Sequence, residues 1–173
     1  MKHRSSPNYN DRKNGALPSM IIVHYTGMPT AQGALDRLCD PDAQVSAHYL
    51  IEKDGTLWQL VDEEKRAWHA GVSFWEGQRD INSLSIGIEL ENGGHEIGYE
   101  PFPDAQVQAL MDLCRDVQAR HDIAPDNVIG HEHIAPGRKM DPGPTFPWQT
   151  LADAGIATWP IKDLARKQDQ SDT

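Results

Sequence analysis

Apolar residues follow two different periods in the first part of the chain. Residues 20–25 form a short apolar and β-branched run, which predicts a buried strand ending at His24. Over residues 31–38 the apolar side chains recur at helical spacing, which predicts a short helix. Two more strand-like runs, 48–52 and 57–61, flank an Asp-Gly pair, and this pair is a signal for a β-hairpin.

The second half of the chain repeats this alternation of strands and helices. Alternating apolar and polar residues over 85–91 predict a strand with one apolar face. Between 103 and 121 apolar residues recur every three or four positions, which is the clearest helix pattern in the chain. A short strand is expected at 128–131, followed by a loop rich in Pro and Gly over 135–147 and by a small helix from Trp148.

Strands interleaved with helices predict an α/β fold, with a central mixed β-sheet flanked by helices. At 173 residues the chain suits a single domain around one core. We expect a loosely held polar arm at 1–19, the domain at 20–160 and a polar tail at 161–173. No internal repeat is present.

Composition and charge exclude several classes of partner. A formal net charge of -10 disfavours binding to nucleic acid, and no apolar run reaches the ~18 residues of a membrane span. Cys39 and Cys114 form no CxxC pair, so neither a disulfide framework nor a thiolate zinc site is expected. The polar start has no apolar segment typical of a secretory signal, which favours the cytoplasm. A chain trimmed of its leader, from the periplasm or cell envelope, would look the same.

Two histidines and one aspartate stand where ligands of a metal ion can converge. His24 and His131 each end a predicted strand, and Asp141 follows in the loop rich in Pro and Gly. Two imidazoles and a carboxylate suit Zn²⁺, and three protein ligands leave its fourth tetrahedral position open to water, as in catalytic sites. This pattern predicts a zinc hydrolase, with the zinc site at the strand ends.

Five short segments between about Ile21 and Trp148 occur in a specific order. They are IVHYT at 22–26, VSAHY at 45–49, AWHAGV at 67–72, SIGIELE at 85–91, and GH at 130–131 leading to DPGP at 141–144. With these segments the chain resembles the zinc-dependent N-acetylmuramoyl-L-alanine amidases of the AmpD and AmiD type. Their superfamily also includes the peptidoglycan-recognition proteins. The resemblance implies that residues 20–160 are an amidase catalytic domain.

The resemblance also implies a role for each matching residue. His24, His131 and Asp141 would hold the zinc, Glu89 would be the catalytic carboxylate and Lys139 the catalytic lysine. Amide hydrolysis needs a base for the attacking water and an acid for the leaving nitrogen, and Glu89 could serve as both in turn. Zinc and the ammonium group of Lys139 would stabilise the oxyanion.

Other interpretations of these residues remain open in the sequence. Glu91 is expected on the same strand face as Glu89 and rivals it. Lys139, next to Arg138, could belong to a basic surface turn. His133 lies two positions from His131 and could reach the same ion, although relatives often carry Asp there; we assign the metal to His131 and a supporting role to His133.

Six further residues are candidates for contact with substrate. They are Tyr25, His48, Arg66, Trp68, His69 and Arg79. His48 could instead belong to the core, and Trp68 and His69 could shape the cleft or simply pack. The two arginines could pair with carboxylates of a stem peptide. Asp80, where some relatives have a basic residue, weakens this interpretation.

The sequence thus predicts a monomeric zinc amidase that cuts the bond between N-acetylmuramic acid and L-alanine. Its partners would be cell-wall peptidoglycan or soluble muropeptide fragments, in cell-wall turnover and recycling. Two alternatives are a peptidoglycan-binding module without catalysis and a metallohydrolase for another amide. The complete set of His24, His131 and Asp141 favours catalysis over mere binding.

Overall fold

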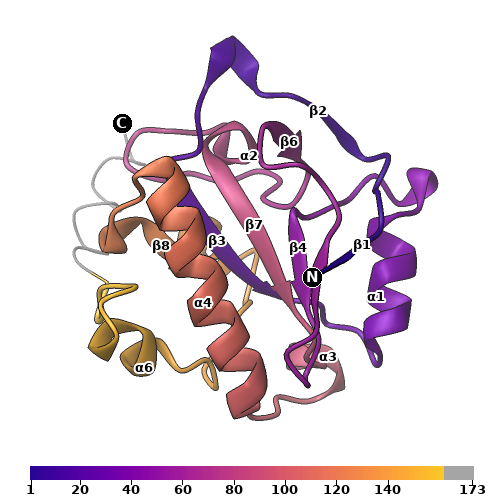
Figure 1. Cartoon of the computed structure of the whole chain (residues 1–173), viewed down its shortest axis with the longest axis vertical. Coiled ribbons are helices and arrows are strands. Elements are labelled where there is room, and N and C mark those ends of the chain that lie inside the picture. Colours follow the sequence, from indigo (N-terminus) through magenta and orange to yellow (C-terminus); the bar gives the residue numbers. More distant parts are fainter. Residues whose placement is uncertain (162–173) are drawn as a thin grey trace.

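A six-stranded mixed sheet lies at the centre of the protein (Figure 1), which is described by a computed structural model over residues 1–161. The strand order is β1-β5-β4-β7-β3-β8, in which β4, β7, β3 and β8 are parallel to one another, β5 is antiparallel to β4, and β1 is parallel to β5. The strands are β1 Lys2–His3, β3 Met20–Tyr25, β4 Tyr49–Ile51, β5 Leu57–Gln59, β7 Ser85–Leu90 and β8 Val128–Gly130. The predicted α/β fold is confirmed. Apart from Ile161, the predicted tail at 161–173 lies outside the described residues.

Both faces of the sheet are covered, because side chains of its central strands alternate between two cores. In β3, Ile21 and Val23 join one buried cluster, whereas Met20 and Ile22 join another. This two-sided burial explains why the sequence of β3 is a continuous apolar run without polar alternation. The next alternate position after Met20 and Ile22 is His24, which therefore lies on the second face.

The first face packs against the long helix α4, Asp104–His121, which crosses the sheet in Figure 1. Leu110, Cys114 and Val117 of α4 are fully buried in this cluster. The shorter helix α6, Trp148–Asp153, adds Trp148 and Leu151. The helices predicted from 103 and from 148 are therefore confirmed.

The second face carries shorter elements and leaves room for a site. Helices α2, Ile81–Leu84, and α5, His131–Ile134, contribute to its apolar cluster. Helix α1, Ala31–Leu38, packs in a third cluster with β4. The remaining helices are α3 Gly94–Ile97 and the 3-10 turns η1 Lys13–Gly15, η2 Pro41–Ala43 and η3 Pro125–Asn127.

The polar N-terminal segment is part of the folded domain, and the expectation of a loosely held arm is wrong. Strand β1 pairs with β5, and β2, Tyr9–Asp11, pairs with β6, Lys65–Ala67, in a second, two-stranded sheet. Arg12 is buried, and its guanidinium donates to backbone carbonyls of Glu63 and Ser83. Across residues 1–161, none of the helices is both long and apolar enough to cross a membrane.

Candidate active site

The carboxyl ends of β3 and β8 deliver the two histidines to the same place. These strands are parallel neighbours, with Val23 opposite Gly130, so both strands end at the same edge of the sheet. His24 is the fifth residue of β3, and His131 begins α5 directly after β8. The loop that follows is tied back, because the Glu132 N–H donates to the backbone carbonyl of Asp141 at 2.8 Å. Three residues distant in sequence thereby become neighbours.

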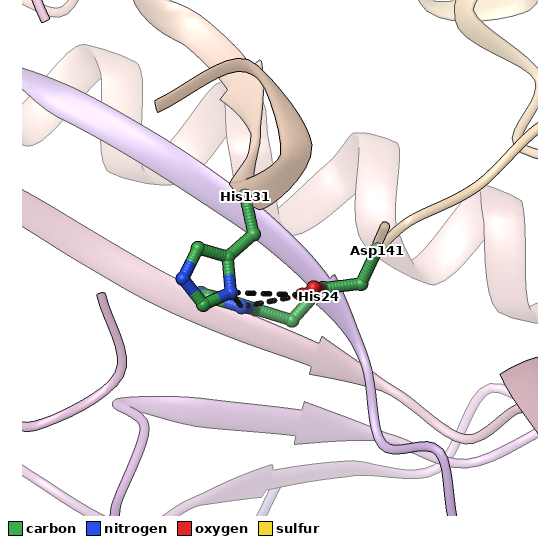
Figure 2. A group of neighbouring side chains, drawn as sticks. All are labelled: His24, His131 and Asp141. Atoms are coloured by element: carbon green, nitrogen blue, oxygen red, sulfur yellow. Dashed lines mark hydrogen bonds and ion pairs between the residues drawn. The ribbon is translucent and has the colours of Figure 1, made fainter. Parts of the chain in front are cut away.

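Figure 2 shows the side chains of His24, His131 and Asp141 pointing at one another. Asp141 Oδ2 lies 2.8 Å from His24 Nδ1 and 3.1 Å from His131 Nδ1, and the two Nδ1 atoms are 3.0 Å apart. All three residues are buried, with exposed fractions of 2%, 3% and 7%. Two nitrogens and one carboxylate oxygen at this spacing can hold a metal ion.

The protonation states of these groups suit a cation. The carbonyl of Ala70 accepts a hydrogen bond from His131 Nε2 at 2.9 Å, which leaves the Nδ1 lone pair of His131 free. Burial, reinforced by His131, lowers the pKa of His24 to about 4, so this imidazole is neutral at pH 7. Burial would raise the pKa of Asp141, but the neighbouring imidazoles of His131 and His24 outweigh it and hold that pKa well below its usual range.

Glu89 lies beside this cluster. It is the register partner of His24, and its side chain leaves β7 on the side opposite the apolar residues Ile86 and Ile88, as the alternation predicts. Its Oε2 is inaccessible and has no hydrogen-bond partner among the described residues. Burial, with a contribution from the Asp141 carboxylate, raises the pKa of Glu89 well above its usual range, and Lys139 opposes this shift.

Glu91, the alternative to Glu89 in the sequence, has a structural role. Its carboxylate accepts hydrogen bonds from the backbone N–H groups of Ala31 at 3.2 Å and Lys53 at 2.9 Å. These bonds join the start of α1 and the β4–β5 hairpin to the end of β7. Glu91 does not line the cleft that contains Glu89.

A cleft of about 660 Å³ opens over the cluster. Its lining includes His24, Glu89, Asp141 and the exposed Lys139. Arg138 also borders it, but its guanidinium donates to backbone carbonyls of residues 70 and 72 and so fastens a neighbouring turn. Of these two adjacent residues, Lys139 is therefore better placed than Arg138 to meet a ligand.

Two of the six candidate substrate residues line the cleft. Tyr25 lines it, and its hydroxyl group forms a hydrogen bond with His95 Nδ1. Burial raises the pKa of Tyr25 to about 12. His69 lies deeper, with Nδ1 2.9 Å from His24 Nε2. It therefore contacts a candidate metal ligand.

His48 and Arg79 do not line the cleft, contrary to expectation. His48 is fully buried, with Nε2 2.9 Å from the carbonyl of Lys65 and Nδ1 accepting from the Gly87 N–H, so it belongs to the core. Arg79 lies over the ring of Phe74, 5.3 Å from its centroid.

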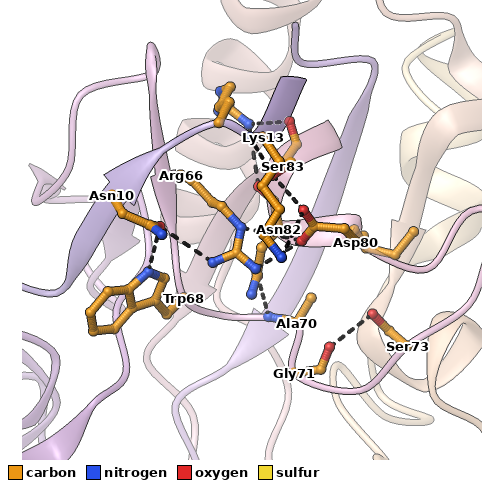
Figure 3. A network of polar contacts seen from close by, with 12 residues as sticks. Asn10, Lys13, Arg66, Trp68, Ala70, Gly71, Ser73, Asp80, Asn82 and Ser83 are labelled. Atoms are coloured by element: carbon orange, nitrogen blue, oxygen red, sulfur yellow. Dashed lines mark hydrogen bonds and ion pairs between the residues drawn. The ribbon is translucent and has the colours of Figure 1, made fainter. Parts of the chain in front are cut away.

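Arg66 and Trp68 form hydrogen bonds away from the cleft, in the polar network of Figure 3. Arg66 donates to Asp80 at 2.8 Å, so the aspartate that weakened its assignment is its partner. Trp68 donates through Nε1 to Asn10 at 2.9 Å. Neither side chain lines the cleft.

His133 does not join the cluster of His24, His131 and Asp141. Its Nδ1 accepts a hydrogen bond from the Gly130 N–H at 2.9 Å, and its ring packs near Trp148 with centroids 5.5 Å apart. The helical turn that begins at His131 sends the two side chains in different directions, whereas an extended chain would have aligned them.

Several residues of the cleft are not predicted by the sequence patterns. Besides His95, the lining includes Met28, Arg37, Glu96 and Met140. His95 and Glu96 belong to α3, directly after the Gly93-Gly94 pair that follows β7. A glycine pair after a strand signals a loop, and loops at strand ends often carry binding residues, so this signal was available.

Comparison with known proteins places the chain in a family. It matches the N-acetylmuramoyl-L-alanine amidase family, Amidase_2, over residues 14–144. The chain belongs to this family. It is 46% identical over 153 residues to N-acetylmuramoyl-L-alanine amidase AmiD of Escherichia coli K12, covering 82% of this chain and 54% of AmiD, so it spans about half of that relative. It is 42% identical over 160 residues to 1,6-anhydro-N-acetylmuramyl-L-alanine amidase AmpD of Salmonella typhimurium SL1344, covering 83% of each.

Solved structures agree with this placement. An AmpD crystal structure superimposes with a TM-score of 0.79 at 36% identity, covering 91% of this chain and 94% of that one. AmiD from E. coli, in complex with the substrate anhydro-N-acetylmuramic acid-L-Ala-D-gamma-Glu-L-Lys, gives a TM-score of 0.77 at 42% identity, covering 96% and 65%. The fold is therefore that of AmpD and AmiD.

Proposed function

We propose that this chain hydrolyses the amide bond between the lactyl group of N-acetylmuramic acid, or its anhydro form, and L-alanine. The observation that carries the proposal is the meeting of His24, His131 and Asp141 beside the half-buried Glu89 in one cleft. Family membership supports this reaction.

We assign zinc to His24, His131 and Asp141. Two imidazole nitrogens and one carboxylate oxygen are a donor set typical of catalytic zinc, and the Nδ1 of His131 is already free of a proton. When bound, zinc would act as a Lewis acid toward a water molecule and the substrate carbonyl. Elemental analysis of the purified protein should find zinc in equimolar amount.

Glu89 would move the proton. Its side chain lines the cleft, so its carboxylate could take the proton from the water whose oxygen attacks the lactyl carbonyl carbon. Glu89 would then give that proton to the amide nitrogen as the C–N bond breaks, so that a lactyl carboxylate and the free amine of L-alanine are formed. Its raised pKa suits a group that must hold the proton between these two steps.

Lys139 would stabilise the negative charge that develops on the carbonyl oxygen. Its side chain lines the same cleft as Glu89 and Asp141. A cation there favours the oxyanion more strongly than it favours the neutral carbonyl, which lowers the barrier.

The first test is Glu89→Gln, which keeps the shape of the side chain and removes its ability to carry the proton. We expect the variant to retain zinc and to lose roughly 10²- to 10⁴-fold in kcat. The measurement is mass-spectrometric detection of stem peptide released from purified muropeptides. Glu91→Gln is the matched control, because its carboxylate only joins backbone segments. Equal turnover by Glu89→Gln and the wild type would remove Glu89 from the mechanism.

The same assay separates catalysis from simple binding. A wild-type protein that retains muropeptides on a column and releases no stem peptide would be a binding module. Hydrolysis of unrelated N-acyl amino acids at equal rates would instead favour a metallohydrolase for another amide.

The form of the substrate is a further part of the proposal. The AmiD structure with an anhydro-muropeptide, and that of AmpDh3 from Pseudomonas aeruginosa with an anhydromuramic pentapeptide, support soluble anhydro-muropeptides. Parallel digestion of these fragments and of intact peptidoglycan would decide between them. The cytoplasmic location and the monomeric state stay predictions, which cell fractionation and light scattering can test.

A further inference from the structure

A chain of hydrogen bonds runs from the sheet to the metal-facing nitrogen of His24. Ser85 has a single hydroxyl proton, which it donates to the carbonyl of Ile81 at 2.7 Å. Its oxygen lies 3.1 Å from His69 Nε2, so that nitrogen must be the donor. A neutral His69 then has a bare Nδ1, and this atom lies 2.9 Å from His24 Nε2. His24 therefore carries its proton on Nε2 and leaves Nδ1 free.

We propose that His69 is a positioning residue, which holds His24 in the tautomer whose Nδ1 lone pair can bind zinc. The inference rests on the metal site of the proposed function. A competing tautomer exists, because His24 Nδ1 lies 2.8 Å from Asp141 Oδ2 and could donate a proton to it. A proton on Nδ1 must leave before a metal can bind. The acceptor on His69 favours the tautomer without that proton.

The shape of β7 makes room for this arrangement. A Cβ atom at Gly87 would lie 2.5 Å from Cγ of the His69 ring, so only glycine allows the ring to rest on the strand. Ser85 and Glu89 flank Gly87 at alternate positions and so leave the strand on the same side. Three residues on one face of β7 therefore have related roles. Ser85 ends the hydrogen-bond chain, Gly87 leaves space for the ring of His69, and Glu89 is the candidate acid–base group.

The backbone of His69 is held as well. Asn82 Oδ1 accepts hydrogen bonds from the N–H groups of His69 at 3.1 Å and Ala70 at 2.8 Å, and Figure 3 shows the second of these. The carbonyl of Ala70 in turn accepts from His131 Nε2. The two-residue segment 69–70 therefore orients both histidines of the cluster, one through a side chain and the other through a carbonyl.

The test compares zinc affinities by competition with a chromophoric chelator. His69→Leu removes the acceptor, and we expect its Kd for zinc to rise roughly 10- to 100-fold, as is typical when a group that orients a ligand is lost. His69→Gln, which keeps a carbonyl oxygen and an N–H, should restore much of the affinity. Ser85→Ala keeps the ring and frees its tautomer, so its Kd should rise by less. This variant decides the matter if His69→Leu does not fold.

His48→Leu is the matched control. The ring of His48 is also buried and its centroid lies 6.0 Å from that of His69. Its nitrogens contact Arg12, Lys65 and Gly87, however, and among the described residues they form no hydrogen bond with His24, His131 or Asp141. We expect His48→Leu to lose stability and to keep the zinc Kd of the wild type. Equal weakening in both variants would reduce His69 to a packing residue.

A spectroscopic measurement reads the tautomer directly. In ¹⁵N-labelled protein without metal, the ¹⁵N shifts of His24 should report a protonated Nε2 in the wild type and a larger share of protonated Nδ1 in His69→Leu. Unchanged shifts together with an unchanged Kd would overturn this inference and leave the proposed function standing. A wild type that binds no zinc would overturn both.

Discussion

His24 and Glu89 are neighbours whose ionisation is suppressed by the same cause. They are register partners in β3 and β7. Burial penalises the charged form of each, so the pKa of His24 falls to about 4 and the pKa of Glu89 rises. His24 is thereby kept as a neutral imidazole that can bind a cation. Glu89 is given a higher affinity for a proton, which suits a group that takes one up and passes it on, and one local environment thus prepares two different roles.

Removing the charge of Lys139 should slow turnover. Lys139→Met keeps most of the aliphatic side chain and removes the charge. We expect kcat to fall roughly 10²- to 10³-fold, as for the loss of a group that stabilises an oxyanion, while zinc content stays unchanged. The release of stem peptide measures the rate.

The control for this variant is Lys53→Met. Lys53 pairs with Glu100 at 2.9 Å and does not line the cleft, so its loss should leave turnover close to that of the wild type. A rise in KM with normal kcat in Lys139→Met would show that the ammonium group binds the ground state and has no particular role in the transition state.

The sequence predicted the meeting of His24, His131 and Asp141 better than it predicted the contacts of single side chains. Glu89 and Glu91 cannot be distinguished by strand alternation alone. Their difference arises from backbone N–H groups of distant segments that happen to reach Glu91. Arg66 was a reasonable partner for a substrate carboxylate until folding brought Asp80 against it. Such partners depend on tertiary structure, which no local pattern contains.

The length of a helix or strand decides whether the sequence predicts it. Strand β3 and helices α1 and α4 have enough residues to show a period, and their predicted limits agree with the structure within one residue. Strands β1, β2 and β6 have two or three residues each and carry no period. They are strands only because a partner lies beside them.

Glu63 contacts residues of β4 and α4, and its carboxylate should make the stability of the domain depend on pH. Its carboxylate accepts hydrogen bonds from Tyr49 of β4 at 2.7 Å and from Arg120 at the end of α4 at 2.6 Å, and it also contacts His121. Burial would raise the pKa of Glu63, but these partners lower it to about 2. The ionised form is therefore favoured in the folded state, and its stabilisation is present above the unfolded pKa of about 4.3.

Glu63→Gln should lower the free energy of unfolding at pH 7 by about 1 to 3 kcal/mol, because its charged partners lose their carboxylate. As the pH falls from 5 toward 2, wild-type Glu63 becomes protonated and the difference between the two proteins should shrink. Urea titrations at a series of pH values measure it. Glu64→Gln, at an exposed neighbour, is the control. A difference that is constant with pH would exclude the carboxylate as its source.

Across the whole molecule, the cluster of His24, His131 and Asp141 joins parts of the domain that are far apart in the sequence. His24 lies 107 residues before His131 and 117 before Asp141. These residues come from β3 at the centre of the sheet, from the start of α5 and from the loop beyond it. An ion bound by all three can form its full set of bonds only in the folded chain, so binding and folding are coupled.

Zinc should therefore raise the stability of the entire domain. Free zinc at ~100 times its Kd adds about 2.7 kcal/mol if the unfolded chain does not bind it. For a domain of this size that corresponds to a rise in Tm of roughly 5 to 10 °C. Calorimetry of the chelator-treated protein, before and after zinc is added, measures the shift.

Asp141→Asn tests whether the stabilisation arises at the cluster. The variant keeps the size of the side chain but replaces the anionic ligand, so most of the rise in Tm should disappear. Asp116→Asn, an exposed position on α4, should keep the full rise, since general binding of zinc to surface carboxylates would be little changed by it. An equal rise in both variants would mean that zinc stabilises the protein from some other place, and the three side chains would then have met for a reason other than metal binding.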